Sequence, residues 1–408
     1  MLLIAKRIVS VSAYRWIFIL LFFSAIASSV VVPVLALFAT DILGASKLDV
    51  TSYFALNALA GVFVVLLVGK LSDSLSSRRV LIFGGFIWLG LGYALLASTN
   101  VFMQMRLIGI LFFSALEIGN SQLFALAKDV ADESVDHQTV SSTTSVLRMA
   151  YSMGWVAGPA VGGFLLLHLD ARDIFRVSTT LYFLCAAMSI LLLPSIRSTL
   201  NQNTALQNVR QLFRREQTPL LIFSIAVIFL LSGDVLRVAF LPIFLEENLQ
   251  ATPNVLGAAF SISPLLQVLF MPLAGVLADR FGSGKVVLSG AVAGFVYYLC
   301  LAYATAIWHV YLLQGLYAFV VASVIGVGIG HAQILGHGEA GLATSSYFSA
   351  KLVAVVLGSV LSGVVAERYG VRSSFLVPAI LCASGFLIVT RVVTAKPRGY
   401  QEIHSGSQ

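Results

Sequence analysis

Charged residues are scarce in this chain. Asp, Glu, Lys and Arg together make up 11% of its 408 residues, whereas soluble globular proteins carry about 25%. This scarcity excludes an ordinary soluble domain. Hydrophobic residues make up 59% of the chain and gather in nearly continuous apolar runs. A bilayer core of about 30 Å is crossed by about 20 helical residues, so these runs predict membrane-spanning helices.

Clusters of groups that carry enzyme chemistry are also missing. The three cysteines, Cys185, Cys300 and Cys382, lie inside apolar runs without metal-ligand spacing, so we expect them to pack as small hydrophobic residues. There is no Ser/His/Asp constellation, no His-Glu-x-x-His sequence and no Gly-rich phosphate loop. We therefore expect no enzyme activity, no metal site and no cofactor.

The apolar runs predict an all-α membrane protein with twelve transmembrane helices. Breakpoints lie where charge, Gly, Pro and Asn gather. The predicted spans are 16–40, 50–70, 79–97, 101–127, 140–167, 173–193, 219–245, 252–278, 285–304, 307–331, 341–366 and 372–394. The one long polar connector divides the chain into a six-helix bundle (1–194), a linker (195–218), a second six-helix bundle (219–394) and a tail (395–408). The first apolar run is too long for a signal peptide and is expected to be a retained helix.

The distribution of basic residues predicts the orientation. Sixteen Lys and Arg residues flank one set of span ends, against six at the other set: Lys47, Arg106, Arg172, Arg176, Arg368 and Arg372. The positive-inside rule then places both termini and the linker in the cytoplasm, which an even number of spans allows. The net charge of +7 is explained in the same way, so we expect no nucleic-acid partner.

A short motif occurs twice at equivalent places. GKLSDSLSSRR (69–79) and GVLADRFGSGK (275–285) both read G-x-L-x-D and end in basic residues, 206 positions apart. Each copy falls at the predicted cytoplasmic connector between the second and third helix of its half. Gly109 and Gly315 are also 206 apart, and Arg148 and Lys351 are 203 apart. These repeats indicate two pseudo-symmetric halves, as parallel repeats do in one transporter architecture.

With these motifs the chain resembles the major facilitator superfamily over essentially its whole length. The residues that match the family's conformational-loop motif are Gly69, Asp73, Arg78, Arg79, Gly275, Asp279, Arg280 and Lys285. The resemblance implies that the Asp anchors a neighbouring helix end while the glycines let helices pack closely during rocking. The first copy departs from the pattern, with Ser74 and Ser76 where Arg and Gly are usual.

A second motif resembles that of proton-coupled exporters in the same superfamily. GWVAGPAVGG (154–163) matches their G-x-x-x-G-P-x-x-G-G pattern. The matching residues are Gly154, Gly158, Pro159, Gly162 and Gly163. Gly and Pro at this density also permit close helix packing, so a generic packing face is the alternative interpretation.

Four stretches are similar to the bacterial sugar efflux transporter family: LNALAG (56–61), SQLFALAKDVADES (121–134), VLRMAYSMGWVAGP (146–159) and GEAGLATSSYFSAK (338–351). The resemblance implies a multi-pass protein of the bacterial inner membrane that exports simple sugars or glycosides by proton antiport, with no cofactor. Transport by rocking halves needs one chain, so we expect a functional monomer. The rival interpretation is a multidrug exporter of the same fold.

Charged residues inside the predicted spans are candidates for proton coupling, because each is costly in a membrane. They are Glu117, Arg148, Asp234, Arg237 and Lys351. Glu117 and Arg148 are predicted at comparable depth on adjacent helices, so we expect a pair that handles the proton, a permanent structural ion pair, or a helix contact away from lipid. Asp234 and Arg237 share a helix face and either neutralise each other or leave Asp234 facing the cavity. Lys351 is either a helix anchor or a direct ligand.

Neutral polar and aromatic side chains are candidates for substrate binding, because each sugar hydroxyl both donates and accepts. They are Asn57, Asn120, Gln122, Tyr151, Trp155, Gln267, Gln314, Gln333 and Tyr347. Interhelical hydrogen bonds and ordinary packing are the alternatives for each of them.

Overall fold

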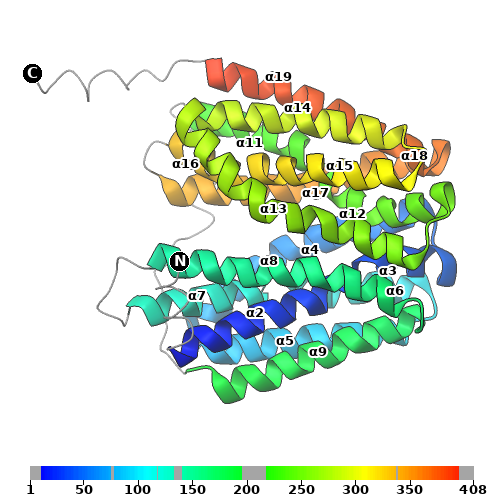
Figure 1. The fold of residues 1–408 in the computed structure, drawn as a ribbon. Helices are drawn as coiled ribbons and strands as arrows, with labels where there is room; N and C mark the ends of the chain where they lie inside the picture. The colour runs from blue at the N-terminus through cyan, green and yellow to red at the C-terminus, as the bar shows by residue number, and fades with distance from the viewer. Residues whose placement is uncertain are drawn as a thin grey trace, which may run out of the picture.

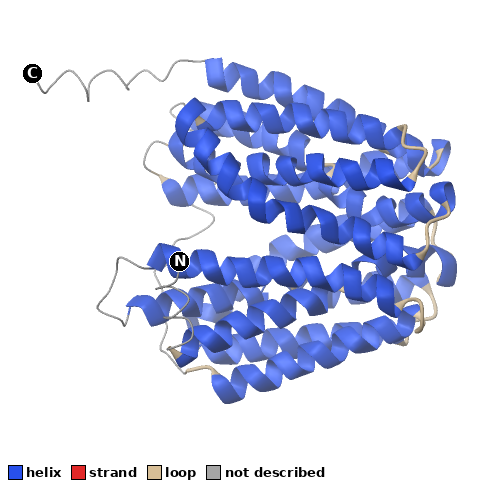
Figure 2. Ribbon diagram, in the orientation of Figure 1, coloured by secondary structure: helices blue, strands red, loops and turns tan. Residues whose placement is uncertain are grey.

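A computed structural model describes residues 11–74, 78–116, 118–132, 140–194, 217–336 and 339–394. Within these ranges the side chains of residues 65–74, 128–129, 131–132, 140–145, 340 and 392–394 are not described. The described residues form helices joined by short connectors and include no strand (Figure 2). The predicted all-α class is confirmed.

The helices of the first half lie together in the lower part of Figure 1. They are α2 (Ser12–Ser29), α3 (Val32–Leu37), the π-helix η1 (Phe38–Ile42), α4 (Lys47–Ser74), α5 (Arg78–Ala97), α6 (Phe102–Phe112), the 3-10 turn η2 (Phe113–Ala115), α7 (Ile118–Asp132), α8 (Val140–Leu165) and α9 (Ala171–Leu192). Within this half α5 packs on α9, and α2 packs on α8 and α9.

The helices of the second half lie together in the upper part of Figure 1. They are α11 (Thr218–Leu231), α12 (Asp234–Ile243), the π-helix η5 (Phe244–Asn248), α13 (Pro253–Phe281), α14 (Ser283–Ala302), α15 (Ile307–Val320), the π-helix η6 (Val321–Val327), α16 (Gly328–Leu335), α17 (Ala340–Tyr369), α18 (Val371–Ser374) and α19 (Leu376–Thr394). Here α11 and α14 pack on α19, and α13 packs on α15.

Ten stretches of the described chain are long and apolar enough to cross a membrane. The other two predicted spans correspond to α4 and α8, which are helices of 28 and 26 residues that include side chains not described. The count of twelve therefore stays a prediction for these two. The domain boundaries also stay predictions, since residues 195–216 of the linker and the tail 395–408 lie outside the described residues.

Large apolar side chains cover the outside of the helices. Leu191, Leu312 and Leu269 are 76%, 71% and 69% exposed. Apolar surface of this extent is rare on soluble monomers, and in a bilayer it lies against lipid. The exposed apolar surface therefore agrees with the membrane spans.

The first helix of each half is interrupted at an equivalent place. The turn at Val30 and Val31 separates α2 from α3, and the turn at Ser232 and Gly233 separates α11 from α12. Pro33, in the first turn of α3, has no N–H to continue the ladder of α2. Irregular backbone at membrane depth is tolerated where it is buried in protein or lines a cavity, so both breaks point to the interior as the functional region.

Close glycine contacts accompany these breaks. A Cβ on Gly162 of α8 would collide with the carbonyl oxygen of Val30, and a Cβ on Gly358 of α17 would collide with that of Ser232. In an unbroken helix, the N–H groups of Val34 and Leu236 would donate to these two carbonyl oxygens. Here Val34 N donates to Val31 O instead, and Leu236 N donates to Gly233 O. The two halves therefore repeat one packing arrangement around two interrupted helices.

The halves contact each other at the end away from the start of α2 and the end of α19 (Figure 1). There α8 packs on α13 and α17 packs on α4. Lys47 at the start of α4 forms an ion pair with Glu247 of η5, and Leu48 N donates to Glu367 Oε2 at 3.2 Å. A Cβ on Gly363 of α17 would collide with Thr51 Oγ1, and a Cβ on Gly163 of α8 would lie 2.8 Å from the Cα of Gly257 on α13. We call this region, defined by these residues, the closed end.

Candidate functional site

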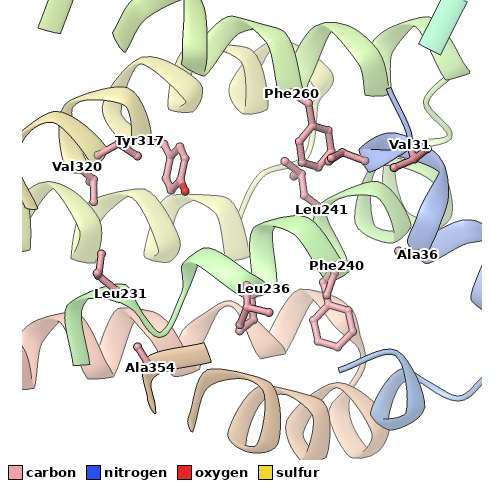
Figure 3. Packing of buried hydrophobic residues seen from close by; sticks show 14 of the residues in the cluster. Val31, Ala36, Leu231, Leu236, Phe240, Leu241, Phe260, Tyr317, Val320 and Ala354 are labelled. Carbon is pink, nitrogen blue, oxygen red and sulfur yellow. The ribbon is translucent and has the colours of Figure 1, made fainter. Parts of the chain in front are cut away.

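Buried polar side chains gather in the second half beside the α11–α12 break. Asp234 begins α12, where its carboxylate complements the positive end of the helix dipole. Tyr317 of α15 donates its hydroxyl to Asp234 Oδ1. Figure 3 shows Tyr317 pointing from α15 into the interior beside the interrupted helix. The break and the side chain thus place a carboxylate and a phenol together at membrane depth.

Arg237 lies one turn further along α12 and is only 7% exposed. Its guanidinium faces the rings of Tyr317 and Phe260 at 4.4 Å and 4.9 Å from their centroids, within cation–π range. Arg237 Nη1 donates a long hydrogen bond of 3.5 Å to Gln314 Oε1. Arg237 forms no ion pair with Asp234 in the described residues, so Tyr317, rather than direct pairing, links the two charges.

Gln314 and Tyr297 complete this group. Gln314 is fully buried and donates from Nε2 to Val310 O at 3.3 Å. Tyr297 Oη lies near Gln314 without a hydrogen bond of normal geometry. Arg237 Nε is likewise buried and without a partner in the described residues. We call Asp234, Arg237, Tyr297, Gln314 and Tyr317 the C-half cluster.

The first half holds a smaller set of buried amides. Asn57 Oδ1 is buried without a partner in the described residues, and a Cβ on Gly109 would lie 2.5 Å from it. Gly109 therefore makes room for the Asn57 side chain. Asn120 is 3% exposed and accepts a 2.8 Å hydrogen bond from Ser24 Oγ, as expected of an interhelical contact.

Several other predicted binding residues are occupied by contacts within the protein. Gln122 Oε1 accepts from Arg78 at 3.1 Å, and Gln267 Nε2 donates to Ser263 Oγ at 3.1 Å. Tyr347 is 1% exposed and its hydroxyl donates to Val324 O at 2.7 Å. The contacts of Gln122 and Tyr347 match the alternative of interhelical hydrogen bonding, whereas that of Gln267 lies within α13.

The remaining predicted binding residues lie in different environments. Gln333 is exposed on α16 and donates to Thr344 Oγ1, so it is not gathered into the C-half cluster. Tyr151 and Trp155 are half-buried on α8 with ring centroids 6.4 Å apart. They therefore form an aromatic pair, as their spacing on one helix face predicts.

The structure separates the predicted coupling residues. Glu117 lies outside the described residues, so its pairing with Arg148 stays a prediction. Arg148 is exposed on α8 and Lys351 is half-buried on α17. Asp234 and Arg237 are the coupling candidates that the structure brings into one cluster.

The conformational-loop motif differs from its predicted position. Helix α4 continues to Ser74 and α13 to Phe281, so Gly69, Asp73, Gly275, Asp279 and Arg280 lie in last helical turns rather than in a connector. The side chain of Asp73 and the surroundings of Gly69 are not described. In the second copy, Leu277, Ala278 and Asp279 do not stop a helix. Helix α13 ends just before Gly282, whose φ of +93° suits glycine.

The charged residues of the two copies differ in environment. Asp279, Arg280 and Lys285 are exposed. Arg78 and Arg79 are half-buried, and Arg79 Nη1 donates to Leu193 O at 3.3 Å. The first copy therefore ties α5 to the end of α9, whereas the charges of the second copy face outward.

The glycine motif of α8 packs that helix on two neighbours. Cβ atoms on Gly154, Gly158 and Gly162 would collide with α2 between Phe22 and Val30. A Cβ on Gly163 would lie 2.8 Å from the Cα of Gly257 on α13. The motif therefore joins α8 both to its own half and to the other one, through backbone contacts that a larger residue would prevent.

Sequence reasoning missed Tyr297, Tyr317 and Phe260 in this site. Each lies in an apolar run, where an aromatic residue is most often packing. Tyr317 had one usable signal, because it follows Gln314 by three residues and so shares its helix face. Tyr297 and Phe260 carried no comparable signal.

The family model and the related sequences place this chain in the same family. A family model described as the Major Facilitator Superfamily matches residues 17–234 and again residues 222–406. Sugar efflux transporter A of Dickeya chrysanthemi is 26% identical over 389 residues, covering 95% of this chain and 97% of the relative. Sugar efflux transporter A of Escherichia coli (strain K12) is also 26% identical, with coverages of 93% and 96%.

More distant matches are of two kinds. Multidrug resistance protein MdtG of Escherichia fergusonii is 22% identical over 381 residues, covering 88% of each chain. The crystal structure of the nucleoside transporter NupG superimposes with a TM-score of 0.79 at 14% identity, covering 93% of this chain and 97% of NupG. At that identity the structural match supports the fold alone.

Proposed function

Because the chain belongs to the Major Facilitator Superfamily, we propose that it is a secondary transporter that exports small sugars or glycosides from the cytoplasm. The direction and the substrate class follow the sugar efflux transporters of similar length and sequence. The glycine motif of α8, which resembles that of proton-coupled exporters, supports coupling by proton antiport.

The C-half cluster is the observation that carries this proposal. It combines a phenol, an amide and a guanidinium with one carboxylate, at the break of an interrupted helix. Transporter sites are often built at such breaks. Its Asp and Arg charges balance, and its hydrogen-bonding groups are those that a neutral polyol needs.

Alternating access is supported by where the halves meet. The closed end holds the Lys47–Glu247 ion pair and the Gly163–Gly257 contact. If both termini are cytoplasmic, as the basic residues predict, the closed end faces outward. The structure then represents a cytoplasm-facing conformation that would accept substrate before export, with protons carried inward in exchange.

Proton coupling is proposed for Glu117 with Arg148 and for Asp234 with Arg237. Lys351, which is half-buried on α17, is proposed as an interior helix anchor. A carboxylate that alternates between a protonated and a partnered state links the proton to the conformational change.

Efflux from vesicles tests the proposal. Proteoliposomes loaded in parallel with radiolabelled glucose, lactose and a bulky cationic dye are followed with and without an imposed pH gradient. We expect sugar efflux that the gradient accelerates and little dye efflux. Efflux of the dye alone would instead support a proton-coupled multidrug exporter, the alternative to which the MdtG match points. No movement of any sugar would contradict the proposal.

A further inference from the structure

The two halves repeat their fold but not their polar interior. Counted from the two helix breaks, Asp234 and Arg237 correspond to Val32 and Leu35 in the first half. Counted from the extended residues Val101 and Ala306 that precede α6 and α15, Gln314 and Tyr317 correspond to Gly109 and Phe112. The same helices therefore form and pack with nonpolar residues at these positions, so the fold itself does not require the C-half cluster.

The cluster also has a surplus of buried donors. Arg237 Nε and Tyr297 Oη are both buried without a partner in the described residues, and Arg237 and Tyr297 are 7% and 0% exposed. Buried polar groups are hydrogen-bonded in the great majority of cases, and leaving one unpaired is costly. The Arg237 Nε–H can only donate and the Tyr297 hydroxyl is able to donate, so an acceptor oxygen would satisfy both groups.

The surrounding side chains narrow the chemistry of that acceptor. The Asp234 carboxylate is occupied by Tyr317, and Gln314 Oε1 by Arg237. Because the charges of Arg237 and Asp234 balance, a cationic ligand would leave a net positive charge at this depth, where charges interact more strongly than in water. A neutral molecule with hydroxyl or ether oxygens satisfies the two donors without adding charge.

We propose that Arg237 and Tyr297 hold a substrate oxygen, so that the C-half cluster is the sugar-recognition site and selects neutral oxygen-rich molecules over cations. This inference rests on the proposed sugar export. It assigns Arg237 to substrate binding in addition to balancing the charge of Asp234. The first half then supports the site without supplying the equivalent recognition groups.

The position of the cluster connects binding to the contact between the halves. Phe260 of α13 lies against the Arg237 guanidinium at 4.9 Å, and Figure 3 shows its ring in the interior near Leu241. One turn earlier on α13, a Cβ on Gly257 would lie 2.5 Å from Pro159 O of the first half. A ligand that moves Arg237 therefore acts on the helix that joins the halves.

Binding to the purified full chain in lipid nanodiscs tests this assignment, with lactose, glucose and ethidium as probes. Tyr297→Phe removes one hydroxyl, and Arg237→Lys keeps the charge but loses the Nε donor. Tyr182→Phe is the matched control, because Tyr182 Oη is also buried and unpartnered among the described residues, but in the first half. Monodisperse elution and a thermal unfolding transition establish that each variant is folded.

We expect Tyr297→Phe to raise the dissociation constant for lactose about 2- to 10-fold and Arg237→Lys about 10- to 100-fold. Tyr182→Phe should change it less than about twofold, within the scatter expected for a distant site. If Arg237→Lys does not fold, Tyr297→Phe still decides the question. Wild-type affinity in Tyr297→Phe, or a larger loss in Tyr182→Phe, overturns the assignment. If the wild-type chain binds ethidium and no sugar, the proposed function is wrong and the assignment with it.

Discussion

Gly163 of α8 and Gly257 of α13 meet backbone to backbone across the two halves. A Cβ on Gly257 would lie 3.0 Å from the Cα of Gly163 and 2.5 Å from Pro159 O. Backbone atoms cannot move aside as the end of a flexible side chain can. The closed end therefore depends on two residues without side chains, one from each half.

Replacing Gly257 by Ala should hinder closure of this end. The added methyl group forces α13 away from α8, at a cost of about 1–3 kcal/mol by analogy with overpacked cores. We expect sugar efflux to fall about tenfold or more, since about 1.4 kcal/mol is a tenfold change in an equilibrium. Efflux from proteoliposomes measures the effect. The control is Gly84→Ala, because a Cβ there meets nothing within 4 Å; equal efflux in both variants would contradict the prediction.

The Lys47–Glu247 ion pair should bias the halves toward closure without being essential. The two side chains are 23% and 49% exposed, and exposed ion pairs contribute about 0–1 kcal/mol. Lys47→Gln, which removes the pair, should therefore open the closed end by no more than about fivefold. Lys47→Glu adds repulsion from Glu247 and should open it further, and the charge-swapped double variant Lys47→Glu with Glu247→Lys should restore closure.

Labelling of a single cysteine measures this opening. Thr51→Cys places the reporter at a fully buried position of the closed end. Cys300, which is exposed, is first replaced by Ser, whereas Cys185 and Cys382 are buried. Faster labelling in Lys47→Glu that the charge swap does not reverse would show that the pair itself has no part in closure.

The sequence predicts helix positions well because bilayer thickness and apolar runs determine them. The predicted span 307–331 corresponds to Ile307–Leu335, and the predicted span 252–278 to Pro253–Phe281. Span ends are predicted less closely, since polar residues continue a helix beyond the apolar run. The span predicted to end at 127 continues as α7 to Asp132.

The site is harder to predict because partners come from different helices. Asp234, Arg237 and Gln314 stand out as polar residues in apolar runs, and the structure brings them together. Tyr317 and Tyr297 do not stand out, because a tyrosine in an apolar run is most often packing. The π-helices η1, η5 and η6 also leave no signal in hydrophobic periodicity, since one extra residue per turn changes only a short stretch.

Replacing Glu117 by Gln should abolish the acceleration of efflux by a pH gradient and leave sugar binding unchanged. The substitution keeps the size of the side chain and removes its ability to exchange a proton. Asp170→Asn is the control, because this exposed residue precedes α9 outside the predicted spans. Gradient-driven efflux and lactose binding are measured on the same preparation. Acceleration that persists in Glu117→Gln would move the coupling role to Asp234, for which Asp234→Asn is the next variant.

Replacing Gly158 by Ala should destabilise the first half, and a second substitution should reverse much of the loss. The new methyl group would collide with Ser29 Oγ and lie 3.1 Å from Val30 N. Overpacking of this kind costs about 1–3 kcal/mol. Ser29→Gly removes the colliding side chain together with its 2.6 Å hydrogen bond to Ala25 O, so the double variant should regain part of the stability rather than all of it.

Thermal unfolding of the purified chain in detergent compares wild type, the two single variants and the double variant. Because the two residues are in contact, their effects should not add, and the coupling free energy should be about 0.5–3 kcal/mol. Additive losses would mean that α8 and α2 are not packed as closely at Gly158 as the structure has them. In that case Pro33 alone would account for the break at Val30, without a contribution from Gly154, Gly158 and Gly162 of α8.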